Sequence, residues 1–373
     1  MLYKLKDIFD LQMGKTPSRN NIEYWNTNDY KWVSISDLTK TDKYIYDTKE
    51  YLSKKAVNES GIKIIPANTV IMSFKLSIGK TAITAEDMYS NEAIMAFHDK
   101  HIVEIIPEYI FYLFKYKNWD DGSNKAVMGK TLNKAILSEV EIDICSIEEQ
   151  RKIVNVLDKI MNLISARKKE LSYLDTFTKA RFVEMFGDPV INSKNLPVVT
   201  LGELSELITK GASPCWQGFS YTDDSSQTLF ITSENIREGY IDLSSPKYIE
   251  DGFNEKQRRS VIRKGDFLIN IVGASIGRAA QFNLDCKANM NQAAALVRVK
   301  DNRIKNKYLL IYLNSDRAKH MYDSMKSDTG RANLSLQDIS DLNILLPAVD
   351  KQIEFENFVA QVDKSKLQKF SAA

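Results

Sequence analysis

Short apolar segments separated by turn residues recur along both halves of the chain. KWVSIS (31–36), TVIMSF (69–74) and AIMAF (93–97) lie in the first half, and TLFITS (228–233), DFLINIV (266–272) and AAALVRV (293–299) lie in the second. Gly, Pro, Asn and Asp break the chain between such runs, which predicts β-strands. Helical spacing of apolar residues predicts helices over 107–117 and 306–325. The pattern predicts an α+β fold for each half.

A much longer helical pattern follows the first of these halves. Ser146 and Glu149 fit a capping box, in which two side chains satisfy each other's free backbone N–H groups at a helix N-terminus. Gly187 and Pro189 are typical of the residues just past a helix C-terminus. We expect a helix over 148–186, about 58 Å long at roughly 1.5 Å per residue.

A second, shorter helical pattern begins near residue 350 and ends near Phe370. Both patterns carry an apolar stripe with a mostly 3–4 spacing, and Arg167 occupies one skipped position. Such a stripe is typical of a coiled-coil seam, although an ordinary core helix is the alternative. The predicted seam residues are Ile153, Leu157, Ile160, Ile164, Leu171, Leu174, Phe355, Phe358, Val359 and Val362.

The chain is an internal duplication with a period near 200 residues. Ser77–Lys80 (SIGK) corresponds to Ser275–Arg278 (SIGR), and other matches follow in the same order at a near-constant offset. They pair Gly14 with Gly211, Pro17 with Pro214, Asp37 with Asn235, Asn91 with Asn291, and Gln150 with Gln352. The predicted segments are two globular domains, 1–145 and 188–348, and two long helices, 146–187 and 349–373.

Composition excludes several classes of protein. Apolar residues make up 43% of the 373 residues, yet no apolar run approaches the roughly eighteen residues of a membrane-spanning helix. The N-terminus does not resemble a signal peptide, so we expect a cytoplasmic protein. The three cysteines are scattered, and His98 and His101 have no carboxylate-rich cluster around them, which favours neither a disulfide framework nor a metal site.

Bulk charge gives no support for nucleic-acid binding. The net charge is +2, and residues 1–147 carry 19 basic and 20 acidic groups, while residues 188–350 carry 20 of each. A basic domain would be the usual electrostatic footprint of such binding. Any DNA-binding surface must therefore be a local patch that the neutral total conceals.

The tripeptide Gly-Lys-Thr, the end of a phosphate-binding loop, occurs three times, beginning at residues 14, 79 and 129. The motif requires another glycine five residues earlier, where this chain has Phe9, Phe74 and Asn124. A nucleotide hydrolase is therefore a weak hypothesis. The shared SIGK and SIGR segments instead predict a tight glycine turn in each half.

This architecture resembles the specificity subunit of type I restriction–modification enzymes. The resemblance extends over nearly the whole chain. It rests on the Ser-Ile-Gly-basic turn of each half and on the helix entries at 146–150 (SIEEQ) and 347–352 (PAVDKQ). The helix exit at 180–189 (ARFVEMFGDP) is the closest match. The final helix departs from the family pattern because it is short, as expected for a truncated subunit or a short natural variant.

The resemblance implies that each globular half is a target-recognition domain that reads one half of a bipartite DNA site. The two helices would pair as an antiparallel coiled coil. Two modification subunits would dock on them and methylate adenine N6 with S-adenosylmethionine. Restriction subunits would add translocation and cleavage that depend on ATP and magnesium. The specificity subunit itself would be non-catalytic and would hold no cofactor, and the chain has neither a Pro-Pro pair nor a Pro-Asp pair for the expected methyltransferase or nuclease motifs.

Candidate DNA contacts are mainly basic and amide side chains in glycine-flanked, loop-like stretches. Arg and Lys suit phosphates and guanine, whereas Asn and Gln suit adenine. The candidates are Lys15, Thr16, Arg19, Asn20, Lys75, Lys80, Lys125 and Lys130 in the first domain, and Lys210, Trp216, Gln217, Asn235, Arg237, Arg258, Arg259, Arg278 and Arg331 in the second. For each of them, a solvated surface side chain is the simpler alternative.

Two basic, glycine-bearing segments occupy the same place in each half, at 124–130 (NKAVMGK) and 327–332 (SDTGRA). We expect both to form DNA-facing loops, and Arg331 and the pair Arg258 and Arg259 are the strongest candidates in the second half. A two-domain coiled-coil scaffold that bridges proteins without any DNA role is the alternative function. The neutral charge of the chain favours the scaffold, whereas the family resemblance favours DNA binding.

Overall fold

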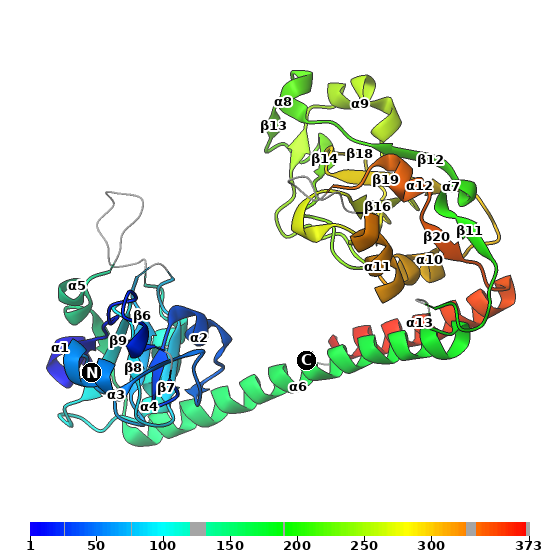
Figure 1. The fold of residues 1–373 in the computed structure, drawn as a ribbon. Helices are drawn as coiled ribbons and strands as arrows, with labels where there is room; N and C mark the ends of the chain where they lie inside the picture. The colour runs from blue at the N-terminus through cyan, green and yellow to red at the C-terminus, as the bar shows by residue number, and fades with distance from the viewer. Residues whose placement is uncertain (26, 76, 120–131, 189–190, 326–332, 371–373) are drawn as a thin grey trace. The chain divides into compact units, whose positions relative to one another are not determined.

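The computed structural model describes residues 1–25, 27–75, 77–119, 132–188, 191–325 and 333–370. The chain divides into two compact units, Met1–Arg167 and Lys168–Ala373. Each unit is a β-rich body with short helices. The first unit also contains the first part of one long helix, and the second contains the rest of it and a second long helix (Figure 1).

The first unit contains a five-stranded sheet, a three-stranded sheet and a two-stranded ribbon among its described residues. Its strands are β1 (Leu2–Lys4), β2 (Phe9–Met13), β3 (Tyr30–Val33), β4 (Tyr44–Ile45), β5 (Glu50–Leu52), β6 (Val70–Ser73), β7 (Thr81–Thr84), β8 (Tyr89–Ser90), β9 (Ile94–Asp99) and β10 (Glu141–Asp143). Its helices are α1 (Leu5–Ile8), η1 (Ile22–Tyr24), α2 (Ile35–Lys40), α3 (Lys54–Ser60), α4 (Pro107–Tyr116), α5 (Lys134–Ser138) and the first part of α6 (Ile147–Phe186).

The second unit contains two four-stranded sheets and a two-stranded ribbon among its described residues. Its strands are β11 (Val198–Thr200), β12 (Ser205–Lys210), β13 (Tyr221–Thr222), β14 (Thr228–Ile231), β15 (Tyr248–Ile249), β16 (Phe267–Asn270), β17 (Ala279–Gln281), β18 (Ala288–Met290), β19 (Ala294–Val299) and β20 (Asn343–Leu345). Its helices are the last part of α6, α7 (Leu201–Leu204), α8 (Pro214–Gln217), α9 (Gly252–Lys256), η2 (Arg258–Ser260), η3 (Gly273–Ser275), α10 (Asn306–Leu313), α11 (Asp316–Met325), α12 (Leu336–Ser340) and α13 (Val349–Phe370).

The internal repeat extends to the order of strands in the sheets. The order β2-β9-β6-β7 in the first unit has its counterpart in β12-β19-β16-β17 in the second. A parallel pair, β3 with β8, corresponds to the parallel pair β14 with β18. The terminal ribbons β1-β10 and β11-β20 also correspond. The sequence matches therefore reflect a duplicated fold.

The Ser-Ile-Gly-basic segments form matching glycine turns. Gly79 and Gly277 have φ angles of +86° and +87°, a left-handed conformation that side chains with a Cβ rarely adopt. A Cβ on Gly79 would lie 2.9 Å from Trp119, and one on Gly277 would lie 2.3 Å from Tyr322. The predicted tight turn is confirmed, because backbone conformation and a close aromatic ring both require glycine.

The sheets are buried on both faces at their centres, which explains their continuous apolar runs. All four residues of β6 and all four of β16 are buried. The helix α4 packs on the first sheet through Ile110, Phe111 and Phe114, while α10 supplies Tyr308 and Tyr312 to the second core.

The two long helices are those expected from the sequence. The helix α6 covers 147–186 where 148–186 was predicted, and Ser146 Oγ accepts the N–H of Glu149 at 3.3 Å. Gly187 follows α6 with a φ of +81°. The predicted fold class, α+β with two β-rich halves and a long helix after each, is confirmed. The predicted domain boundaries stay predictions.

Within the second unit, the end of α6 and the helix α13 pack antiparallel (Figure 1). Arg181 pairs with Glu354 at 3.0 Å, and Asp175, earlier in α6, pairs with Lys366, later in α13, at 2.6 Å. Phe182 lies between these helices and the core, with its ring centroid 5.5 Å from that of Phe355. Burial of aromatic rings supplies most of the stabilising free energy of such helix packing.

The apolar stripe of α6 has two different uses. Ile153 and Leu157 pack against the core of the first unit, and Ile160 and Ile164 are 45% and 43% exposed. In the described residues, the contacts of α6 with α13 come from its later part, around Phe182. The sequence assigned Ile153, Leu157, Ile160 and Ile164 to one seam, because spacing identifies an apolar face but not the surface that covers it. On the side of α13, Phe355, Val359 and Val362 are buried.

Candidate nucleic-acid interface

The first candidate surface is the loop that leaves β2. Its start is held close to the end of β8, because the Lys15 N–H donates to the Ser90 carbonyl at 2.8 Å. A Cβ on Gly14 would lie 2.2 Å from the carbonyl oxygen of Asn91, so the close approach requires glycine. The Trp32 indole N–H donates to the Lys15 carbonyl at 3.1 Å. The loop is therefore fixed at its base, although its tip is exposed.

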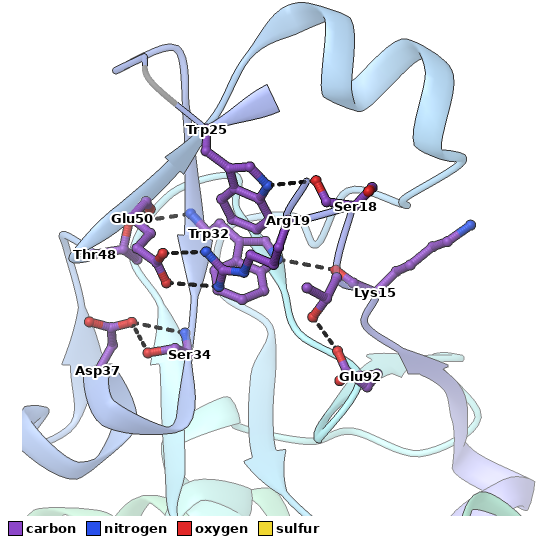
Figure 2. Close-up of polar contacts among 11 residues, drawn as sticks. Lys15, Ser18, Arg19, Trp25, Trp32, Ser34, Asp37, Thr48, Glu50 and Glu92 are labelled. Atoms are coloured by element: carbon purple, nitrogen blue, oxygen red, sulfur yellow. Dashed lines mark hydrogen bonds and ion pairs between the residues drawn. The ribbon is translucent and has the colours of Figure 1, made fainter. Parts of the chain in front are cut away.

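Arg19, in this loop, lies at the centre of an aromatic and acidic cluster to which other segments contribute (Figure 2). Its guanidinium carbon is 3.7 Å from the ring centroid of Trp25 and 4.9 Å from that of Trp32. Both terminal nitrogens donate to the Glu50 carboxylate. The arginine side chain remains 49% exposed. A stacked, carboxylate-paired arginine is held flat with part of its donor fork open to solvent, which suits recognition of a base edge or phosphate.

The other candidates in this loop differ in whether their side chains already have hydrogen-bond partners within the first unit. Thr16 is half-buried and donates to the Glu92 carboxylate, and this hydrogen bond lowers the pKa of Glu92 below its usual value. The Lys15 ammonium donates to the Ser60 carbonyl at 2.5 Å. Asn20 is exposed.

The lysines beside the first glycine turn are half-buried. The Lys80 ammonium donates to Thr39 Oγ1 at 2.6 Å, and its backbone N–H donates to Ser73 Oγ at 3.1 Å. The Lys75 ammonium lies 5.3 Å from the ring centroid of Phe74. Both side chains therefore have contacts within the first unit, and Lys80 serves the turn itself.

The equivalent loop of the second unit presents an aromatic side chain. Gly211 is pressed against β18, since a Cβ there would lie 1.8 Å from the Met290 carbonyl oxygen. Five residues later Trp216, in the short helix α8, is 89% exposed. Counted from the matching prolines, Trp216 occupies the position that Arg19 has in the first unit. An indole with this exposure is suited to stacking on bases or sugars.

Polar neighbours support the Trp216 loop. The Gln217 side-chain oxygen accepts a hydrogen bond from Gln257 at 3.1 Å, and its carbonyl accepts one from the Lys256 ammonium at 2.9 Å. Arg258 and Arg259 follow directly in the chain and are exposed. The structure thus brings Gln217 close to the segment that carries the two arginines. Lys210, at the end of β12, is also exposed.

Two candidates in the second unit, Asn235 and Arg237, have structural partners. Asn235 is 6% exposed, and its side chain accepts from Thr232 and donates to the Asp242 carbonyl. In the first unit, Asp37 Oδ2 likewise accepts the backbone N–H of the residue three positions earlier, Ser34, at 2.8 Å. Arg237 pairs with Asp242 at 3.1 Å.

Arg278 is half-buried beside the second glycine turn, where its carbonyl accepts the Asn270 N–H at 2.9 Å. The candidates Lys125, Lys130 and Arg331, and the two loops predicted around them, lie outside the described residues.

Sequence reasoning missed Trp25, Glu50 and Lys256. Trp25 and Glu50 come from different segments, and only the fold places both on Arg19. A usable signal existed for Trp25, because it lies six residues after an arginine in a polar stretch. Among the residues that the structure describes, no group of His, Cys, Asp and Glu could hold a metal ion. No helix in the described part of the chain has the length and apolarity needed to cross a membrane.

Comparison with known families now identifies the class of protein. The type I restriction modification DNA specificity domain matches residues 1–173 and again residues 194–369. The chain belongs to this family and carries two copies of its domain, in agreement with the duplicated fold.

Two specificity subunits are similar to this chain in sequence. The chain is 33% identical to the MjaIX specificity subunit of Methanocaldococcus jannaschii over 213 residues, which cover 56% of this chain and 48% of that subunit. It is 22% identical to the EcoprrI specificity subunit of Escherichia coli, over 94% of this chain and 84% of that one. The aligned region thus spans about half the length of the first relative and most of the second.

A solved structure shares the fold. It comes from work on complex assembly and conformational transition of the type I restriction–modification system. The TM-score is 0.58 at 18% identity, with 100% of this chain and 93% of that chain covered.

Proposed function

We propose that this chain is the sequence-specific DNA-binding subunit of a type I restriction–modification complex, with each unit reading one half of a bipartite site. The observation that carries the proposal is the double family match over 1–173 and 194–369. The exposed loops support it. A stacked arginine in one unit and an exposed tryptophan at the matching place in the other would read different half-sites.

Duplication within one chain has a physical consequence for assembly. A repeated chain offers two similar surfaces, so two identical modification subunits can bind without a symmetric dimer of the specificity subunit. We propose that these partners supply S-adenosylmethionine and adenine methylation, and that restriction subunits supply ATP- and magnesium-dependent activity. The chain described here would contribute binding and positioning and no catalytic group. Because its proposed target is cellular DNA, we expect it to act in the cytoplasm.

Salt dependence of DNA binding tests the proposal. Lysines and arginines that neutralise phosphates release counterions, so affinity must fall as salt rises. If each unit contacts about three phosphates, affinity should fall by about a thousandfold between 50 and 200 mM salt. The measurement is fluorescence anisotropy of labelled duplexes with the modification subunit present. Failure to bind duplex DNA in that complex would favour the protein scaffold instead.

Arg19→Ala should reduce affinity for the cognate duplex by about 10- to 100-fold, the usual worth of one good base contact. Arg19→Lys keeps the charge but loses the planar stack on Trp25. Compared with Arg19→Ala, the lysine variant should therefore regain more of the salt dependence of binding than of the preference for the cognate sequence. Arg303→Ala is the matched control, because Arg303 is also an exposed arginine paired with a carboxylate, that of Asp301. Equal losses of affinity for Arg19→Ala and the control would show that Arg19 does not contact the DNA.

A further inference from the structure

A fully buried glutamine lies one turn inside each long helix. Gln150 in α6 and Gln352 in α13 are both 0% exposed. A buried amide is costly unless its donors and its acceptor are all engaged. Their contacts therefore indicate what these two residues do.

Both side chains make the same set of hydrogen bonds. The Gln150 oxygen accepts the Ile106 N–H at 2.9 Å, and its nitrogen donates to the carbonyls of Glu104 at 2.9 Å and Cys145 at 3.0 Å. Each amide group thus joins two stretches of backbone that are distant in sequence. One stretch directly precedes α4, and the other directly precedes the long helix.

In the second unit, the Gln352 oxygen accepts the Lys305 N–H at 2.8 Å, and its nitrogen donates to the carbonyls of Arg303 and Pro347, both at 2.8 Å. The stretch at 303–305 directly precedes α10, the counterpart of α4. Three bonds from one planar amide fix the position and the rotation of the helix end against its own domain.

We call the three hydrogen bonds of each buried glutamine the joint between the long helix and its domain. Further contacts along each helix also hold it on that domain. In the first unit, Asp158, two turns beyond Gln150, accepts from Lys43 at 2.5 Å and also from the Tyr112 hydroxyl. In the second unit, Glu356 accepts the Lys307 N–H at 3.0 Å, and Asp363 pairs with the Lys307 ammonium at 2.7 Å. A helix held at its end and again along its length cannot pivot freely on its domain.

We propose that Gln150 and Gln352 are positioning residues that set the spacing between the two DNA half-sites. The inference rests on the proposed function, since it assumes that both units bind one duplex. In B-DNA one base pair changes the half-site separation by about 3.4 Å and the angle between half-sites by about 35°, from roughly 10 base pairs and 34–36 Å per turn. A helix that pivoted on either domain would accept several spacings, whereas a locked helix accepts one.

The chemistry of the amide makes the test sharp. Leucine has a similar size but leaves the Ile106 N–H and two carbonyls without partners in the first unit. Asparagine keeps the neutral amide but is one methylene shorter, so it cannot reach all three backbone partners at once. Gln150→Asn and Gln352→Asn are therefore the second set of variants if the leucine variants fail to fold.

The experiment measures spacing preference with the half-sites unchanged. The full chain, with its modification subunit, is presented with duplexes that keep the half-sites found by mapping methylated adenines and vary only the spacer length. We expect the wild-type complex to prefer one spacer over those one base pair shorter or longer by about tenfold or more. In Gln150→Leu, Gln352→Leu and the double variant, that preference should fall to about threefold or less, with half-site preference unchanged.

Two controls separate positioning from general destabilisation. Gln337→Leu replaces an exposed glutamine that bonds only Asp341 among the described residues. Ile339→Val weakens the core of the same unit and leaves the three hydrogen-bond partners of Gln352 unchanged. Both controls should keep the wild-type spacing preference. Folded glutamine variants that keep an equally sharp preference would overturn the inference, whereas a wild-type complex that binds no duplex would overturn the proposed function instead.

Discussion

Asp266→Ala should lower the free energy of unfolding of the second unit by about 3 kcal/mol, the lower end of the usual cost of leaving a buried charge without its main partner, because Glu206 stays 3.9 Å from Arg298. The Asp266 and Arg298 side chains are 3% and 14% exposed, and the arginine donates to the carboxylate at 2.8 and 2.7 Å. The hydrogen bond to Asp266 raises the pKa of Arg298 above its usual value, so the guanidinium stays charged. The substitution also removes the acceptor of the Arg263 N–H.

The first unit provides the matched control for this prediction. His98 occupies in β9 the place that Arg298 has in β19, and Thr69 precedes β6 as Asp266 precedes β16. Since neither Thr69 nor its replacement carries a charge, Thr69→Ala should cost only about 1 kcal/mol. Urea unfolding, with hydrogen exchange at β6 and β16 to assign each loss to its unit, makes the comparison. Similar costs at the two positions would contradict the prediction.

Gly277→Ala should destabilise the second unit by about 2–5 kcal/mol. The left-handed backbone costs a non-glycine residue about 1–2 kcal/mol, and overpacking of a core costs about 1–3 kcal/mol more. The new Cβ would lie 2.3 Å from the ring of Tyr322, which is 1% exposed and has little room to move.

Gly273→Ala separates these two causes. Gly273 has a φ of +80°, but a Cβ there would have nothing within 4 Å, so only the backbone cost of about 1–2 kcal/mol applies. Denaturant unfolding of both variants, monitored in the core around Tyr322, measures the difference between their free energies of unfolding. Equal losses would show that the Tyr322 ring yields and that the turn requires glycine for its backbone alone.

The candidate DNA-binding residues show the limits of residue type as a guide. Asn235 is of the right type for adenine, yet its amide is used inside a turn. Lys80 is basic and beside a glycine, yet its ammonium contacts Thr39. Arg19 is predicted from its residue type and its loop-like surroundings, whereas its stack on Trp25 and its pair with Glu50 depend on segments that meet only in the folded unit.

The sequence by itself determined the duplication, the two glycine turns and the extents of α6 and α13. These features depend on local rules: left-handed φ at Gly79 and Gly277, capping at Ser146 and the stop at Gly187. The sequence also pairs Gln150 with Gln352 as equivalent positions of the repeat, but it does not predict that both amides are buried and hydrogen-bonded.

Tertiary structure alone decided which surface covers each apolar face. The stripe of α6 packs on the first core at Ile153 and Leu157, is open at Ile160, and meets α13 around Phe182. The physical reason is that periodicity specifies which side of a helix is apolar, whereas burial depends on residues far away in the chain. Hydrogen bonds such as those of Gln352 to residues 303 and 305 are likewise set by contacts between distant segments.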